Sequence, residues 1–141
     1  MTDVPFHYVD LRAFCYATED EDRVERALRT FLPEGFTIDR AASEGHHGDR
    51  IVLLSARAEN ADDVRHVLDR LAAIDLDRIR DELDDRVNDN CALFMRLDKQ
   101  AAYGGRIERG EGLELRGKIE AYPAKKEAAV ENAADALEAR S

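Results

Sequence analysis

The feature that most constrains the fold of this chain is a repeated change in the spacing of its apolar residues. Along residues 7–17 (HYVDLRAFCYA), side chains alternate between two faces with a period of two and are rich in aromatic rings, which is typical of a β-strand. From Val24 to Leu32 the apolar residues recur every three or four positions, as on one face of a helix. The sequence predicts that Thr18–Glu21 opens this helix as a capping box and that it ends before Pro33.

The same two periods alternate along the rest of the chain. Further strands are predicted at residues 36–42, 50–58, 91–97 and 113–121. Between them, Asn60 is expected to cap a second helix, and after a break the helical spacing resumes over residues 76–87. A last helix is expected to start at Pro123, and the polar, glycine-rich segment 98–112 is expected to be a loop.

These elements give the order β-α-β-β-α-α-β-β-α, which predicts an α+β fold with one mostly antiparallel sheet and helices on one face. The chain has 141 residues, the usual size of one domain, and no linker or internal repeat divides it. Residues 1–141 are therefore expected to form a single domain. The order of the strands within the sheet is left open.

The charge composition is strongly biased. The chain has 31 acidic and 21 basic residues, a net charge of −10, and only four lysines beside 17 arginines. Abundant aspartate with scarce lysine resembles the composition of proteins from salt-loving archaea, and the alternative is an ordinary acidic domain. In an ordinary cell this net charge would argue against a nucleic-acid partner. In a halophile every protein surface is acidic, so only the distribution of charge is informative.

The chain is expected to be cytoplasmic. Its N-terminus lacks the basic and apolar regions of a signal peptide, and no apolar run approaches the ~20 residues of a membrane span. Cys15 and Cys91 form no CxxC pair, and in a reducing compartment we expect two buried thiols.

No catalytic motif is present in the sequence. It contains no GxSxG, P-loop, GxGxxG or HExxH pattern, and the glycines of residues 104–112 precede no predicted helix. The adjacent His46 and His47 would point in opposite directions on an extended chain, which disfavours a shared metal ion. Acidic runs are expected to be solvated helix faces. The sequence therefore predicts a protein that is not an enzyme and has no cofactor or metal.

Positive charge is concentrated in one segment. Residues 96–126 hold eight basic residues, among them all four lysines, and five acidic residues. The segment also includes Tyr103 and Tyr122. Basic side chains for phosphates together with aromatic rings for bases suit a single-stranded or looped RNA. Surface pairs of lysine and glutamate would produce the same pattern, and charge alone does not decide between the two interpretations.

Two stretches of this segment resemble an archaeal family of small RNA-binding proteins that are often described as exosome-associated subunits. They are residues 94–103 (FMRLDKQAAY) and 118–126 (KIEAYPAKK), and residues 7–21 and 44–48 are similar to the family as well. The family's fold is similar to that of the large-subunit ribosomal protein that binds the smallest ribosomal RNA. The resemblance implies RNA binding, an α+β sheet and no established catalytic residues.

The leading hypothesis is a non-catalytic RNA-binding protein whose basic side chains converge on one outward patch. The residues predicted to contact phosphates are Arg96, Lys99, Arg106, Lys118, Lys125 and Lys126. The residues predicted to contact a base are Gln100 and Tyr103, and those predicted to extend the surface are His46, His47 and Arg50. The expected partners are RNA and exosome or ribosomal proteins. The second hypothesis is a module that assembles an RNA-processing or ribosomal complex without touching RNA.

Overall fold

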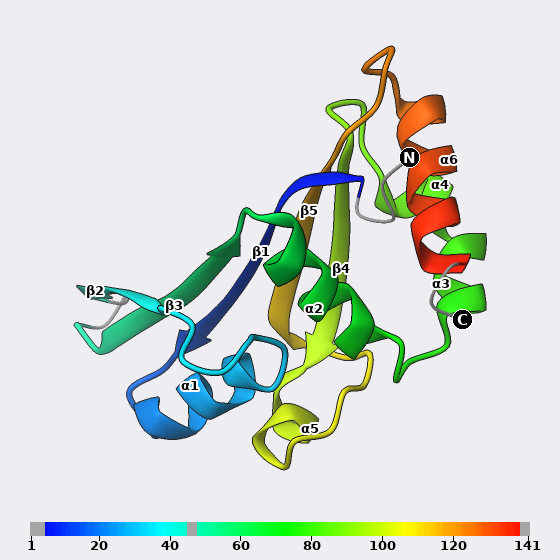
Figure 1. Ribbon diagram of the computed structural model, residues 1–141. Helices are drawn as coiled ribbons and strands as arrows, with labels where there is room; N and C mark the ends of the chain where they lie inside the picture. Colours follow the sequence, from blue (N-terminus) through cyan, green and yellow to red (C-terminus); the bar gives the residue numbers. More distant parts are fainter. Residues whose placement is uncertain (1–4, 45–47, 139–141) are drawn as a thin grey trace.

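The computed structural model, which describes residues 5–44 and 48–138, contains a five-stranded antiparallel sheet with the strand order β2-β3-β1-β5-β4 (Figure 1). The strands are β1 (Phe6–Cys15), β2 (Asp39–Glu44), β3 (Arg50–Ala58), β4 (Ala92–Asp98) and β5 (Gly112–Ile119). The helices are α1 (Glu21–Arg29), α2 (Ala61–Leu71), α3 (Leu76–Asp81), α4 (Leu83–Arg86), α5 (Lys99–Tyr103) and α6 (Lys126–Glu138).

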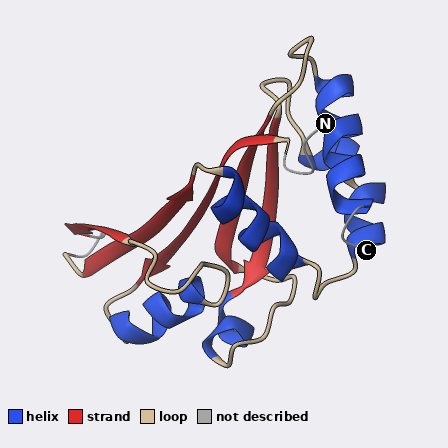
Figure 2. Cartoon of the chain, in the orientation of Figure 1, coloured by secondary structure: helices blue, strands red, loops and turns tan. Residues whose placement is uncertain are grey.

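One face of the sheet builds the core. Helices α1 and α2 contact β1 and β3 from this side (Figure 2), and every second residue of β1 from Val9 to Cys15 is buried. Helices α3, α4 and α6 pack together beside β4 at the far edge. Burial of this apolar face is the main driving force for folding, and it leaves the opposite face of the sheet uncovered by α1 and α2.

The predicted α+β class and the antiparallel sheet are confirmed, and so is the cap at Asn60, whose side chain accepts a hydrogen bond from the Asp63 amide. The strand order places β1 in the centre, between β3 and β5. Consecutive strands therefore pair only as β2 with β3 and as β4 with β5. Both Cys15 and Cys91 are buried free thiols, as predicted.

The start of the first helix differs from the prediction. Asp20, not Thr18, is the N-cap, and its carboxylate accepts a hydrogen bond from the Asp22 amide at 2.9 Å. The prediction of a capping box that uses Glu21 is wrong, because the segment before Asp20 makes contacts outside the helix. There the Glu19 carboxylate binds Lys99, from a distant part of the chain, and the Tyr16 amide.

Two other boundaries are displaced. Strand β2 begins at Asp39, three residues later than predicted, because the preceding Phe36 and Ile38 pack partly buried against the core. The last helix begins at Lys126 instead of Pro123. In both places a short-range signal marked the region but not the exact boundary.

The segment expected to be a loop contains a helix. Helix α5 follows β4 directly, and its N-cap Asp98 accepts a hydrogen bond from the Ala101 amide at 2.9 Å. The predicted helical stretch 76–87 is also divided into α3 and α4, which meet at Glu82. Glu82 takes part in the site described below.

Candidate nucleic-acid interface

The face of the sheet turned away from α1 and α2 carries ordered rows of charged and aromatic side chains. The rows arise because alternate residues of each strand point to this side and the pairing register aligns them across neighbouring strands. One row consists of Phe94, Arg116, Asp10 and Arg57, and the next consists of Arg96, Glu114, Arg12 and Ser55. We call these two rows, together with Tyr8, Phe14 and Tyr16, the open face.

Two arginines of the open face are already paired with carboxylates. Arg12 contacts Glu114 at 2.6 Å, and Arg57 binds both oxygens of Asp10 at 2.7 and 2.9 Å. The Arg57 guanidinium also lies 4.0 Å from the ring centroid of Tyr8. These pairs orient Arg12 and Arg57 and neutralise both acidic residues of the two rows.

Arg96 and Arg116 supply positive charge in excess of these pairs. The nearest carboxylate to Arg96 is Glu111 at 3.9 Å, and since the two side chains are 69% and 86% exposed, water screens this contact strongly. Within residues 5–44 and 48–138 no carboxylate forms an ion pair with Arg116, whose guanidinium lies 5.5 Å from the ring centroid of Phe94. Both guanidinium groups are therefore available to an anionic ligand.

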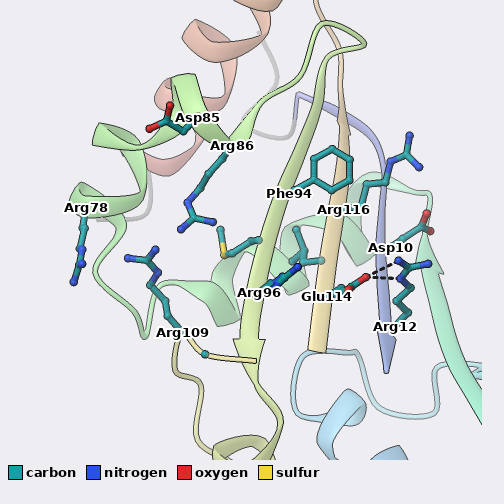
Figure 3. Close-up of a pocket in the computed structure, with 13 residues that line it drawn as sticks. Asp10, Arg12, Arg78, Asp85, Arg86, Phe94, Arg96, Arg109, Glu114 and Arg116 are labelled. Atoms are coloured by element: carbon teal, nitrogen blue, oxygen red, sulfur yellow. Dashed lines mark hydrogen bonds and ion pairs between the residues drawn. The ribbon is translucent and has the colours of Figure 1, made fainter. Parts of the chain in front are cut away.

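A groove of about 840 Å³ follows the open face and continues around β4, the edge strand (Figure 3). Figure 3 shows Phe94, Arg116 and the Arg12–Glu114 pair on one side of β4, with Arg86 and Arg109 on the other. Six arginines and three acidic residues line it. The six arginines are Arg12, Arg78, Arg86, Arg96, Arg109 and Arg116. A chain with a net charge of −10 thus has a groove with an excess of basic side chains.

Glu82 joins the three arginines beyond β4. Arg86 and Arg109 contact its carboxylate at 2.7 and 2.8 Å, and Arg78 contacts it at 3.6 Å. The hydrogen bond from Arg86, followed by that from Arg109, lowers the pKa of Glu82, so the carboxylate stays charged at neutral pH. One carboxylate holds three guanidinium groups in place and offsets only part of their charge.

Aromatic rings are exposed among these arginines. Phe14 and Tyr16 stack with their ring centroids 6.4 Å apart, and Phe94, two rows away, is 44% exposed. A smaller cavity of about 220 Å³ lies at Phe14 and Tyr16, and its lining shares Arg12 and Arg96 with the groove. Aromatic and cationic groups therefore form one continuous surface.

Two of the predicted site residues, Lys99 and Tyr103, make contacts inside the fold. Lys99 is only 7% exposed, and its ammonium group contacts the Glu19 carboxylate at 2.7 Å and the Phe14 carbonyl oxygen at 3.1 Å. The Tyr103 hydroxyl donates to the same carboxylate at 2.8 Å, and burial followed by this hydrogen bond raises the pKa of Tyr103. Lys99 therefore presents little charge to phosphate, because the partly buried Glu19 carboxylate pairs with its ammonium group.

The other predicted residues do not converge on one patch. Arg96 and Lys118 lie on strands of the open face, where the Lys118 ammonium donates to the Asn90 carbonyl oxygen. Gln100 and Arg106 are exposed beyond the end of β4, whereas Lys125 and Lys126 follow the end of β5. Because β4 and β5 are antiparallel, these two groups lie at opposite ends of the strand pair, about 25 Å apart at roughly 3.3 Å per residue. Arg50 is exposed at the start of β3, and His46 and His47 lie outside the described residues.

The sequence contained a signal for the residues that were missed. The alternation along residues 8–16 separates Arg12 and Phe14 from the apolar side of β1, and that along residues 113–121 separates Arg116 from the apolar side of β5. The sequence did not indicate that β1, β5 and β4 are neighbours in the sheet. Without the strand order, these side chains are merely exposed residues on separate strands.

Residues 5–44 and 48–138 contain no group of three His, Cys, Asp or Glu side chains placed to hold a metal ion. Over the same ranges, no helix has the length and apolar character needed to cross a membrane.

Comparison with known proteins agrees with a nucleic-acid interface. A family model described as RNA binding matches residues 8–119. RNA-binding protein PAB1135 of Pyrococcus abyssi is 30% identical over an alignment of 144 positions, and the alignment covers 94% of each chain.

Two solved archaeal structures are similar over nearly their whole length. Mth689, a DUF54 protein from Methanothermobacter thermautotrophicus, is 40% identical with a TM-score of 0.81, and the match covers 94% of this chain and 98% of that one. Protein AF2318 from Archaeoglobus fulgidus is 26% identical with a TM-score of 0.81, over 93% and 99% of the two chains. Since the family model spans most of the sequence and the relatives match it almost from end to end, the chain belongs to this archaeal family of RNA-binding proteins.

Proposed function

We propose that this protein is a non-catalytic RNA-binding protein and that it holds RNA against the open face of its sheet. The observation that carries the proposal is the gathering of six arginines in one groove of a chain whose net charge is −10. Guanidinium groups bind phosphate through paired N–H donors and remain charged at any physiological pH. RNA supplies phosphates in a line, which suits a groove and not a single pocket.

Arg96 and Arg116 are the residues to which we assign the first phosphate contacts. They lie on adjacent strands one row apart, and neither has a close carboxylate partner among the described residues. Arg86 and Arg109 extend the same line beyond β4. Six further predicted residues would act as outer contacts with a longer RNA, because they lie around this surface and not within it. They are the exposed Gln100, Arg106, Lys125 and Arg50 and the partly buried Lys118 and Lys126.

A matched pair of charge reversals tests the assignment. Arg116→Glu and Arg26→Glu change the net charge equally, but Arg26 is exposed on α1, on the other side of the sheet. Fluorescence anisotropy with labelled cellular RNA should show a loss of affinity of about tenfold or more for Arg116→Glu and a small change for Arg26→Glu. Equal losses would mean that only net charge matters and would refute a site on the open face.

We also propose that the protein works in RNA processing in the cytoplasm, in contact with the exosome. The buried free thiols of Cys15 and Cys91 suit a reducing compartment. Affinity purification with and without nuclease tests the association. Exosome subunits that are lost after nuclease treatment would indicate a link through RNA. Subunits that remain would favour the alternative of a protein-interaction module.

The composition supports a working environment of high salt, and this affects how RNA can be held. Binding through phosphates weakens as salt rises because it depends on the release of counterions. With 31 acidic residues and four lysines, the protein has a surface suited to such conditions. Contacts that do not depend on counterions must then supply a larger part of the affinity.

A further inference from the structure

We infer that the RNA held by this surface is unpaired and that its bases stack on two aromatic platforms of the open face. The first platform is Phe94 with Arg116, and the second is Phe14 with Tyr16. The inference rests on the proposed function and adds the class of RNA that the same surface selects.

The exposed aromatic rings are the first reason. Four large apolar side chains are exposed in the described part of the chain, and three of them, Phe14, Tyr16 and Phe94, belong to the open face. Exposing apolar rings to water costs free energy, so a cluster of them between arginines points to a ligand that covers rings and carries negative charge. A double helix presents phosphates and hydroxyl groups but keeps its bases stacked inside, whereas single-stranded RNA offers free base faces.

The arrangement of the two platforms is the second reason. Phe94 and Phe14 differ by four residues along the strand direction and by two strands across the sheet, which places them about 16 Å apart at roughly 3.3 Å per residue and 4.8 Å per strand. The row that lies between them carries Arg96 and Arg12. A strand of several nucleotides can therefore place bases on both platforms and phosphates beside the arginines of the intervening row.

Gly112 lines the cavity beside the second platform. Its position lies one row beyond Glu114 on β5, and Phe14 and Tyr16 line the same cavity. The cavity of about 220 Å³ opens at the edge of these rings. Space for a base is thus available where the aromatic pair is exposed.

The effect of salt is the third reason. Stacking of bases on aromatic rings does not release counterions, so it is retained under conditions that weaken phosphate contacts. An acidic protein that binds RNA with few exposed cations therefore benefits from rings within its cationic groove. Rings that lie between arginines provide both kinds of contact to the same strand.

An introduced tryptophan gives a direct test, because the chain contains none. Phe94→Trp places one reporter on the first platform, and Tyr122→Trp places one at an 87% exposed position outside the open face. A 12-nucleotide single-stranded RNA should quench the fluorescence of Phe94→Trp and leave that of Tyr122→Trp nearly unchanged. The same sequence as a duplex should quench neither.

Affinity measurements complete the test. Phe94→Leu and Phe14→Leu should each lower the affinity for the single strand by about 5- to 100-fold, and the loss should persist at high salt. If the duplex binds as tightly as the single strand, or if both leucine variants bind the single strand like the wild type, the inference is wrong. The proposed function would survive that result provided that Arg116→Glu still weakens RNA binding and Arg26→Glu does not. If neither RNA binds to the wild type, both proposals fail.

Discussion

The ammonium group of Lys99 lies 2.7 Å from the carboxylate of Glu19, although the two residues come from opposite halves of the sequence. The same ammonium group lies 5.5 Å from the ring centroid of Tyr16. Lys99 therefore joins helix α5 to the segment that follows β1. It also contacts both residues of the Phe14–Tyr16 platform, through the Phe14 carbonyl oxygen and the Tyr16 ring. Lys99 and Tyr103, which belong to the stretch 94–103 that resembles the family, have a structural role in this fold.

Removing the charge of Lys99 should destabilise the protein. Lys99→Met leaves the Glu19 carboxylate without its cation, which should lower the free energy of unfolding by about 2 kcal/mol. Urea unfolding at constant salt measures the change, and Lys125→Met, at an exposed lysine, is the control. The folded Lys99→Met variant should retain most of its RNA affinity. A stable variant that no longer binds RNA would instead place Lys99 in direct contact with the ligand.

The stability of this cluster should depend on pH. Burial by itself would raise the pKa of Glu19, but the hydrogen bonds from Lys99, Tyr103 and the Tyr16 amide outweigh it and lower the pKa. A carboxyl group with a lowered pKa stabilises the folded state fully above its unfolded-state pKa of about 4.3, and this contribution is lost as the pH falls through the folded-state value.

We therefore expect Glu19→Gln to be less stable than the wild type at pH 7 and to approach it in acid. The difference in free energy of unfolding should shrink between about pH 5 and pH 3. Chemical unfolding at a series of pH values measures both proteins. A difference that stays constant over this range would show that the Glu19 carboxylate gains nothing from its partners.

Gly112 should not tolerate a side chain. Its φ of +105° is rarely adopted by other residues, and an added Cβ would lie 2.6 Å from the Cβ of Lys99. We expect Gly112→Ala to lower the free energy of unfolding by about 2–3 kcal/mol. Gly104→Ala is the control, since its nearest neighbour would be a carbonyl oxygen at 3.6 Å. Thermal unfolding of the two variants should separate them clearly.

Neutralising Glu82 should strengthen RNA binding. Its carboxylate is bound by Arg86 and Arg109, so Glu82→Gln frees these guanidinium groups for phosphate. The exposed Glu131 on α6 provides a control with the same change in net charge. Anisotropy titrations should show several-fold tighter binding for Glu82→Gln than for Glu131→Gln. Weaker binding by Glu82→Gln would mean that the carboxylate is needed to orient the arginines.

The outlying cations should matter less than those of the open face. Arg106→Glu and Lys125→Glu change charge at opposite ends of the β4–β5 pair, outside the groove. Each should weaken binding of a short RNA by less than Arg116→Glu does, because fewer phosphates reach these positions. A loss at Arg106 or Lys125 equal to that at Arg116 would favour the surface predicted from charge alone.

Several features followed from the sequence because they depend on neighbouring residues. The alternation along β1, the cap at Asn60 and the burial of Cys15 and Cys91 result from local spacing and apolar character. Local signals also gave the α+β class and the excess of basic residues between 96 and 126. They did not reveal that Lys99 is buried, because a lysine after a strand looks the same whether or not a distant carboxylate pairs with it.

The sequence by itself determined where the five strands and the longer helices lie and which side of each strand is apolar, since hydrophobic spacing acts over a few positions. It did not reveal helix α5. Only the tertiary structure decided that Phe94, Arg116, Asp10 and Arg57 share a row. That row requires β1 to lie between β3 and β5, an arrangement set by the burial of one common apolar face against α1 and α2. Side chains far apart in the sequence meet because the strands that carry them pair in the order that buries this face best.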